Sequence, residues 1–278
     1  MLKHTVSTTR RTFFKYLGAG TAATALLGQD MLSAHATSTQ FVTESNHEGA
    51  GINVLLAHGA YADASSWSKV IMLLQAKGYT VLAPEMPLSS LQDDIDVVRQ
   101  AFASLSGPTI LVGHSYAGAV ITNVGVGASN LLSLVYTTAF APEAGESIAD
   151  INARFSAPPG ASHVVPSYRK GYIWVDPAAF PNNFLQDVDK DEARVLAVVQ
   201  KPATPAIFSA PSGTPAWKQV PSWCLISKYD RMINPDAERF MARRIGAKAY
   251  EVPSSHASPV SHPHDVVKLI VAASQKRH

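Results

Sequence analysis

A serine at position 115 lies in the motif Gly-His-Ser-Tyr-Ala-Gly, which spans residues 113–118. The apolar run 109–112 before the motif is typical of a buried strand, and the residues after it can continue as a helix. A nucleophilic serine on a sharp strand-to-helix turn requires small residues two positions before and after it, and Gly113 and Ala117 meet this requirement. The same short pattern also occurs in surface turns, but the flanking strand and helix favour the nucleophile.

Apolar runs and helical spacings alternate along most of the chain. This alternation predicts an α/β fold in which a parallel sheet carries helices on both faces. Ser89 is expected to cap the second helix. The expected strands cover residues 52–57, 79–83, 109–112, 131–136, 223–227 and 248–252, and the expected helices, besides the one after Ser115, cover 67–77, 89–105, 235–245 and 263–273.

Residues 141–219 interrupt this alternation with many prolines and with eight large aromatic side chains. We interpret this segment as a lid inserted over the sheet edge, rather than a separate domain, because strand–helix alternation resumes after it. One helix is expected at 187–200. Trp174, Phe180 and Trp217 are expected to line an apolar substrate pocket near the serine, since aromatic rings outside a core often line ligand sites.

A serine hydroxyl is a weak nucleophile and needs a histidine base, which in turn needs an orienting carboxylate. Asp230 directly follows the fifth expected strand and is the predicted acid. Asp236 is the alternative, but it lies inside the next expected helix, where it suits the helix dipole. His256 follows the last expected strand and is the predicted base. His262 and His264 compete with it, although both lie at the start of the final helix.

An oxyanion hole needs two backbone N–H donors close to the nucleophile. The residue after the serine, Tyr116, is expected to supply one of them. The loop after the first strand is expected to supply the other, and Ala60 in the run His-Gly-Ala is the candidate. His58 opens that run and could be a second base, but a role in supporting the loop is favoured because His256 already fills the role of base.

Together these residues resemble an α/β-hydrolase with a small lid, similar to the plant methylesterase and hydroxynitrile lyase group. The resemblance covers about residues 52–273 and implies a six-stranded core without the first two strands of larger hydrolases. Lyases of this group place a lysine after the catalytic histidine, whereas this chain has Ala257, so the resemblance favours an esterase. The matching features are His-Gly-Ala at 58–60, Trp67, the serine motif, Asp230, and His256 with Pro263 seven residues later.

The first 36 residues resemble a twin-arginine export signal. Arg10 and Arg11 precede a weakly apolar stretch at 16–27, and Ala-His-Ala at 34–36 fits a small-x-small cleavage site. That stretch is too short to span a bilayer as a permanent helix, and an uncleaved anchor is the alternative. We therefore expect a signal peptide (1–36), a flexible leader (37–50) and a hydrolase domain (51–278), in a periplasmic or secreted protein without stable membrane insertion.

The composition narrows the chemistry further. A formal net charge of +2 implies no basic surface for nucleic acid, and the single cysteine, Cys224, lies in an apolar run typical of a core. The predicted function is hydrolysis of small hydrophobic esters through an acyl-enzyme on Ser115, without a metal or cofactor. Lactone hydrolysis, perhydrolysis as in cofactor-free haloperoxidases, and carbon–carbon cleavage are alternatives, as is a non-enzymatic ligand receptor.

Overall fold

The computed structural model describes residues 48–275 of the chain. The predicted signal peptide, and all but the last three residues of the predicted leader, lie outside the described residues. In those last three residues, Gly49 donates its N–H to the carbonyl oxygen of Lys77 at 3.0 Å. No helix within residues 48–275 is both long enough and apolar enough to cross a membrane.

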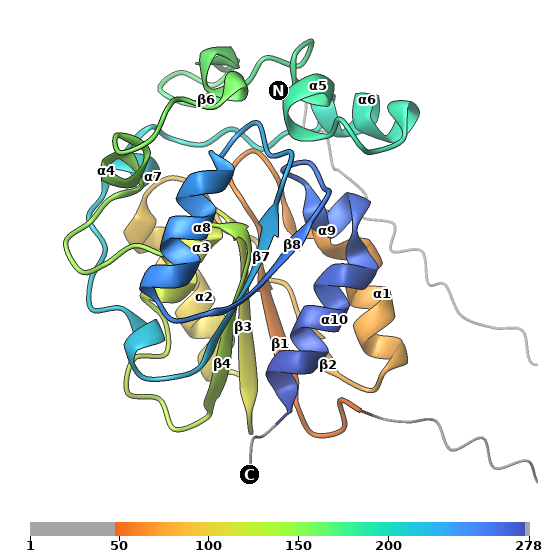
Figure 1. Ribbon diagram of the computed structural model, residues 1–278, viewed down its shortest axis with the longest axis vertical. Coiled ribbons are helices and arrows are strands. Elements are labelled where there is room, and N and C mark those ends of the chain that lie inside the picture. The colour runs from red at the N-terminus through yellow and green to blue at the C-terminus, as the bar shows by residue number, and fades with distance from the viewer. Residues whose placement is uncertain (1–47, 276–278) are drawn as a thin grey trace, which may run out of the picture. The chain divides into compact units, whose positions relative to one another are not determined.

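Six strands form the central sheet in the order β2-β1-β3-β4-β7-β8, and every neighbouring pair is parallel (Figure 1). The predicted parallel sheet is therefore confirmed. Two strands run three residues beyond their predicted ends, which brings Ser115 to the end of a strand. The strands are β1 (Asn53–Ala57), β2 (Thr80–Leu82), β3 (Thr109–Ser115), β4 (Leu131–Ala139), β7 (Ser222–Ser227) and β8 (Lys248–Val252).

Helices cover both faces of this sheet. Successive side chains of a strand point to opposite faces, and in β1 Val54 and Leu56 join one buried apolar cluster while Leu55 joins the other. The cluster that contains Val54 and Leu56 also includes side chains from α1 and α10. The cluster that contains Leu55 includes side chains from α2, α3 and α8. The helices are α1 (Ser68–Ala76), α2 (Leu91–Ala103), α3 (Ala117–Thr122), α8 (Pro235–Arg244), α9 (Ser258–Ser261) and α10 (Pro263–Ser274).

Helix α2 begins one residue later than predicted, because its cap is Ser90 rather than Ser89. Ser90 has an extended backbone, and its hydroxyl accepts a hydrogen bond from the N–H of Asp93 at 3.0 Å. Ser89 instead donates its hydroxyl to the Asp93 side chain at 2.7 Å. Both serines precede the apolar stripe of the helix, so the sequence pattern does not show which of them is the cap. The structure does, because only the Ser90 hydroxyl accepts the N–H of the third helical residue, Asp93.

The lid segment, residues 141–219, folds into short elements beyond the carboxyl ends of the strands (Figure 1). Its helix α6 is shorter than the predicted 187–200, and it begins only at Lys190 because Asp189 caps it, accepting hydrogen bonds from two backbone N–H groups of the first turn. The elements are α4 (Ile148–Asn152), the antiparallel pair β5 (Val164–Pro166) and β6 (Ile173–Val175), α5 (Phe180–Phe184), α6 (Lys190–Val198) and α7 (Ala206–Ser209).

Backbone hydrogen bonds join the lid segment to the loops that follow β7 and β8. The N–H of Gly160 donates to the carbonyl oxygen of Arg231 at 2.7 Å, and the N–H of Ala257 donates to that of Phe184 at 3.2 Å. The lid segment is thus tied to the two loops in which Asp230 and His256 were predicted to act.

Candidate active site

Ser115 ends β3 in a left-handed backbone conformation, with a φ of 54°. Residues other than glycine adopt this conformation rarely, and such strain persists only where the surrounding structure holds it. A Cβ atom at Gly113 would lie 2.7 Å from the carbonyl oxygen of Ala117, and one at Gly118 would collide with the carbonyl oxygen of Phe140. These contacts explain why small residues must flank the serine.

The structure brings Ser115, His256 and Asp230 into one hydrogen-bonded chain. His256 Nε2 lies 2.9 Å from Ser115 Oγ, and His256 Nδ1 lies 2.7 Å from Asp230 Oδ2. The other carboxylate oxygen of Asp230 accepts hydrogen bonds from the N–H groups of Met232 at 2.6 Å and Ile233 at 3.0 Å. With Nδ1–H directed to the carboxylate, Nε2 is left to accept the proton of the serine hydroxyl.

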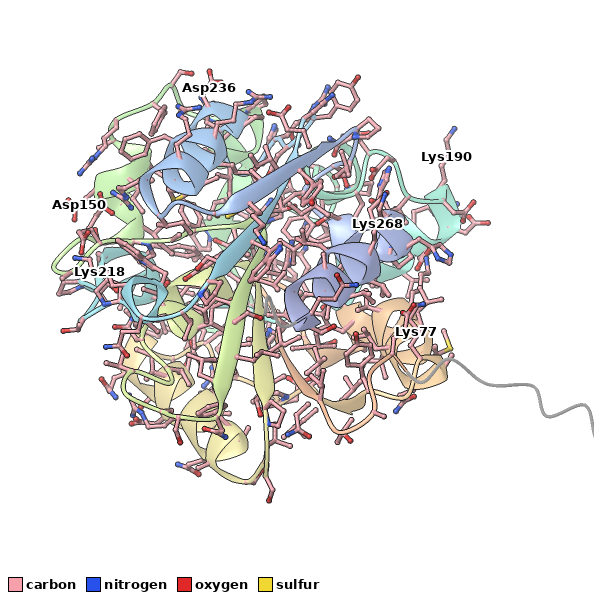
Figure 2. All side chains as sticks on the ribbon, turned by 60° about the horizontal axis from the view of Figure 1, so that its bottom comes forward. Lys77, Asp150, Lys190, Lys218, Asp236 and Lys268 are labelled. Atoms are coloured by element: carbon pink, nitrogen blue, oxygen red, sulfur yellow. The ribbon has the colours of Figure 1, made fainter. Side chains whose placement is uncertain are left out.

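The competing candidates lie elsewhere. Asp236 lies at the periphery of the domain, where its carboxylate pairs with Arg239 at 2.9 Å (Figure 2). His262 lies between α9 and α10, and His264 is exposed in the first turn of α10. Among the hydrogen bonds of residues 48–275, none joins these three side chains to Ser115.

A second histidine, His114, contacts the loop of His256. Its Nε2–H donates to the carbonyl oxygen of His256 at 2.8 Å. Burial lowers the pKa of His114 to about 3, so the ring is neutral near pH 7. The ring of Phe184 packs edge-on against both His114 and His256, with centroid distances of 6.3 and 4.5 Å. These contacts restrain the position of the His256 imidazole.

The two residues predicted to form an oxyanion hole are Tyr116 and Ala60. Tyr116 follows Ser115 directly as the N-cap of α3, and Ala60 lines the same cavity as Ser115 and His256. In the described part of the chain, the N–H groups of Ala60 and Tyr116 have no protein acceptor. Two such groups beside a serine are suited to stabilise a negative charge that develops on a bound carbonyl oxygen.

His58 supports the loop that carries Ala60. Its Nε2 accepts the N–H of Met86 at 3.0 Å, so the proton is on Nδ1, which donates to the carbonyl oxygen of Gly59 at 3.0 Å. The side chain is fully buried. Both ring nitrogens are therefore used in holding the loop, as the sequence favoured.

Asp94 is a buried acidic residue for which the sequence suggested no role. Its carboxylate accepts hydrogen bonds from the Tyr116 hydroxyl at 2.7 Å and from the N–H of Leu88 at 2.9 Å. Burial raises the pKa of Asp94. Its spacing carried a signal, because Asp94 lies three residues after Leu91 and four before Val98, on the apolar side of α2. A carboxylate on that side of a helix requires a buried donor.

Glu238 on α8 is a second buried acid that the sequence did not reveal. One carboxyl oxygen accepts the N–H of Ser227 at 3.2 Å, and the other has no protein partner among residues 48–275. Burial and the negative charge of Asp230 raise the pKa of Glu238 well above its usual range. Cys224, predicted to be a core thiol, is indeed buried and unpaired, and burial raises its pKa.

A cavity of about 200 Å³ opens beside Ser115 and His256. None of the residues that line it is an aspartate, glutamate, lysine or arginine, and most of them are apolar. Tyr61 and Asn152 add the polar side chains other than those of Ser115 and His256. The apolar lining comes mostly from the lid segment and from the loop after Asp230, and it includes Phe140, Ile148, Val164, Ile173, Phe184, Phe208, Met232 and Ile233.

Trp174, Phe180 and Trp217 do not line this cavity, so the predicted pocket residues are corrected. Side chains alternate along β6, and Ile173 faces the cavity while its neighbour Trp174 packs against the exposed Tyr168. Trp217 donates its indole N–H to the carbonyl oxygen of Pro142 at 3.0 Å, and so packs onto the chain at the start of the lid segment.

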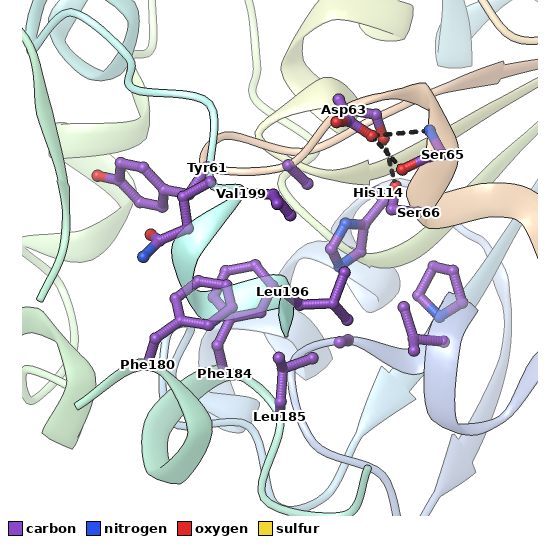
Figure 3. Close-up of a pocket in the computed structure, with 15 residues that line it drawn as sticks. Tyr61, Asp63, Ser65, Ser66, His114, Phe180, Phe184, Leu185, Leu196 and Val199 are labelled. Carbon is purple, nitrogen blue, oxygen red and sulfur yellow. Dashed lines mark hydrogen bonds between the residues drawn. The ribbon is translucent and has the colours of Figure 1, made fainter. Parts of the chain in front are cut away.

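Phe180 lies one aromatic layer behind the cavity. Its ring stacks on that of Phe184, with centroids 4.6 Å apart and planes 15° apart. Phe180 lines a second cavity of about 40 Å³, which His114 also lines (Figure 3). Tyr61 and Phe184 line both cavities and stand between them. The prediction named three aromatic residues, and none of the three lines the cavity beside Ser115.

No group of three or more metal-ligating side chains occurs within residues 48–275. The arrangement that the structure does present is a strained serine and a histidine that line an apolar cavity, with a carboxylate hydrogen-bonded to the histidine. This combination is the one used for nucleophilic catalysis on acyl groups.

Comparisons with known proteins agree with this class. The model of the alpha/beta hydrolase family matches residues 54–269. An alpha/beta hydrolase of Aspergillus novofumigatus is 25% identical over 243 residues, which are 78% of this chain and 94% of that protein. A carbendazim hydrolyzing esterase of a Nocardioides species is 37% identical over 109 residues, which are 34% of this chain and 45% of that protein.

Among solved structures, a methylesterase from Arabidopsis superposes with a TM-score of 0.68 at 16% identity, covering 80% of this chain and 98% of that one. This similarity concerns the fold. The family match extends over most of the chain, and the chain therefore belongs to the alpha/beta hydrolase family.

Proposed function

We propose that this protein is a carboxylic-ester hydrolase that acts through an acyl-enzyme on Ser115. The observation that carries the proposal is the chain of hydrogen bonds from Ser115 through His256 to Asp230. Ser115 and His256 also line the apolar cavity. Support comes from relatives named for ester hydrolysis, the carbendazim hydrolyzing esterase and the Arabidopsis methylesterase.

In the first half of the reaction, Ser115 Oγ attacks the ester carbonyl carbon while His256 Nε2 takes the hydroxyl proton. Asp230 holds the imidazole in the required tautomer and stabilises its positive charge. The carbonyl oxygen becomes negatively charged and accepts hydrogen bonds from the N–H groups of Ala60 and Tyr116. The tetrahedral intermediate then collapses, and His256 passes the proton to the departing alkoxide.

In the second half, water replaces the alcohol. His256 removes a proton from the water as its oxygen attacks the acyl carbon, and the bond to Ser115 Oγ then breaks. The proton returns to Ser115 Oγ through His256, and the carboxylic acid leaves. None of these steps requires a metal ion or a cofactor.

The cavity favours small, uncharged, hydrophobic esters. Its lining is mostly apolar, and a charged substrate group would lose its hydration there without gaining a partner. Its volume of about 200 Å³ limits the size of the substrate group that it can enclose. A short hydrophobic or aromatic acyl or alcohol group meets both restrictions.

Turnover of p-nitrophenyl esters, with labelling by a fluorophosphonate, tests the proposal. We expect many turnovers per molecule, a single label on Ser115, and loss of both with Ser115→Ala, since removing a serine nucleophile costs on the order of 10⁴–10⁶ in kcat. Labelling at another residue, or turnover by Ser115→Ala, contradicts the proposal. Binding without turnover indicates a receptor, and faster reaction with lactones or with hydrogen peroxide indicates one of the alternative reactions.

Carbon–carbon cleavage of the lyase type is disfavoured by one residue. The position after His256 is Ala257, which is buried and whose side chain carries no positive charge.

We also propose that the protein is exported by the twin-arginine pathway and acts in the periplasm or outside the cell. That proposal rests on the sequence of residues 1–36.

A further inference from the structure

Five hydroxyl groups form a continuous hydrogen-bonded chain inside the protein, at the carboxyl ends of β4 and β7. Thr137 Oγ1 lies 2.9 Å from Ser258 Oγ, which lies 2.7 Å from Thr138 Oγ1. Thr138 Oγ1 lies 2.6 Å from Ser227 Oγ, which lies 2.6 Å from Ser254 Oγ. All five side chains are fully buried. We call this set the hydroxyl network.

The hydroxyl network joins the segments that carry the acid and the base. Ser227 precedes Asp230 by three residues, and its carbonyl oxygen accepts the N–H of Asp230 at 3.2 Å. Ser254 precedes His256 by two residues, and Ser258 follows it by two. The network therefore holds the acid turn and both sides of the histidine loop together.

The network also reaches the strand beside the nucleophile. The pairing of β3 with β4 passes from His114 with Thr137 to Ser115 with Ala139, so Thr138 forms a bulge directly next to the serine. The N–H of the following Phe140 donates to the carbonyl oxygen of Ser115 at 3.2 Å. The position of Ser115 thus depends on the shape of this bulge.

Thr138 is strained at the bulge, with a φ of 50°. A β-branched residue in the left-handed region is a rare outlier and needs compensating contacts. Its hydroxyl has two partners, Ser227 and Ser258, which lie on the acid segment and the histidine segment. The strained residue is therefore the point at which the segments of Ser115, Asp230 and His256 meet.

We propose that the hydroxyl network sets the relative positions of Ser115, His256 and Asp230, with Thr138 and Ser227 as positioning residues. The inference rests on the proposed function of these three residues. A buried hydroxyl is tolerated only when it is hydrogen-bonded. Thr138, Ser227 and Ser258 each have two partners within the network, whereas Thr137 and Ser254 each have one, so removing one of the inner three breaks two bonds.

The test compares three variants of β4 in the otherwise intact protein. Thr138→Val removes the hydroxyl and keeps the shape, and Thr138→Ser keeps the hydroxyl. Ser133→Ala is the matched control, because Ser133 is also fully buried on β4 but donates its hydroxyl to the carbonyl oxygen of Ala273 at 3.1 Å, outside the network. The measurements are kcat and KM for a p-nitrophenyl ester, the rate of fluorophosphonate labelling of Ser115, and the melting temperature.

We expect Thr138→Val to lower kcat and the labelling rate in parallel, by about 10- to 100-fold, with KM changed by less than about twofold, because misplaced reacting groups slow chemistry rather than binding. Thr138→Ser should recover most of both rates. Ser133→Ala should lower the melting temperature without slowing either reaction. If Thr138→Val does not fold, Ser227→Ala replaces it with the same expectation.

Two results overturn the inference. One is a Thr138→Val or Ser227→Ala protein with a lower melting temperature but unchanged kcat and labelling rate. The other is an equal loss of both rates in Ser133→Ala. Wild-type protein that is not labelled on Ser115 would instead contradict the proposed function itself, so the two failures are distinguishable.

Discussion

Glu238 shares its buried surroundings with Asp230, whose negative charge raises the pKa of the Glu238 carboxyl group. Asp230 accepts three hydrogen bonds, from the N–H groups of Met232 and Ile233 and from His256 Nδ1. Glu238 accepts one, from the N–H of Ser227. The raised pKa means that Glu238 keeps its proton to a higher pH than an exposed glutamate does.

A protonated Glu238 makes stability depend on pH. Its pKa is higher in the folded protein than in the unfolded chain, where it is about 4.3, so the folded state binds more protons above that pH. Its contribution to stability is therefore greatest at low pH and is lost as the pH rises towards the folded value. Glu238→Gln cannot ionise, and we expect its stability relative to wild type to increase from pH 5 to pH 8. Urea denaturation measures this, and a constant difference would contradict a raised pKa.

Asp230→Asn should leave Ser115 in place but lower kcat by about 10⁴-fold, because the amide cannot hold the imidazole in the reactive tautomer. Steady-state kinetics with a p-nitrophenyl ester measure the loss. Asp236→Asn is the control, since Asp236 pairs with Arg239 on the outside of α8, and it should change kcat by less than about twofold. A reversed result for the two variants would assign the acid to Asp236.

Ile173→Ala should raise KM for a phenyl ester by about 5- to 30-fold with little change in kcat, because the lost apolar contact contributes equally to substrate and transition state. Trp174→Ala is the control on the opposite side of β6 and should leave KM within about twofold of wild type. If Trp174→Ala raises KM and Ile173→Ala does not, the cavity beside Ser115 is not where the substrate binds.

Tyr116→Phe should lower the free energy of unfolding by about 1–3 kcal/mol, since the buried carboxylate of Asp94 then lacks one of its two donors. Burial raises the pKa of Asp94, so the loss should become smaller as the pH falls and Asp94 takes up a proton, because a protonated Asp94 needs that donor less. Tyr136→Phe removes a buried hydroxyl bonded to Thr122 at 3.0 Å, a neutral partner, and its loss should not change with pH. Equal pH dependence in the two variants would mean that the protonation state of Asp94 does not change over the pH range measured.

Export should remove residues 1–36. We expect N-terminal sequencing of protein from the periplasm or the medium to begin at Thr37 or within a few residues of it, because Ala-His-Ala at 34–36 fits the cleavage rule. Replacing Arg10 and Arg11 by lysine should leave the protein inside the cell. An intact N-terminus in the membrane fraction would instead support an uncleaved anchor.

The sequence predicted those features of the fold that depend on chain order and local pattern. Strand–helix alternation predicted the parallel sheet. The positions of Asp230 and His256 directly after their strands were sufficient to select them over Asp236, His262 and His264, and the structure joins the selected pair to Ser115. The carboxyl ends of parallel strands lie at one edge of the sheet, so residues that are far apart in the chain meet there. This meeting can be predicted even when the packing of the side chains is not known.

Features that depend on side-chain direction or on long-range burial could not be predicted. Trp174 and Ile173 are neighbours, and only the orientation of β6 decides which of them faces the cavity. Glu238 is an acidic residue on a helix rich in charged residues, and only the packed structure shows that it is buried. The cap of α2 is Ser90 rather than Ser89, and the pattern of apolar residues does not resolve a difference of one residue.

The backbone bonds that join Gly160 to Arg231 and Ala257 to Phe184 bear on how this protein can change over evolution. A lid that only rested on the sheet could be exchanged between relatives as an independent module, altering substrate choice alone. Here an exchanged lid would also replace the atoms that hold the loops of Asp230 and His256. Substrate range and reactivity are therefore inherited together. A chimaeric protein that keeps both must receive the lid together with the two loops to which it is bonded.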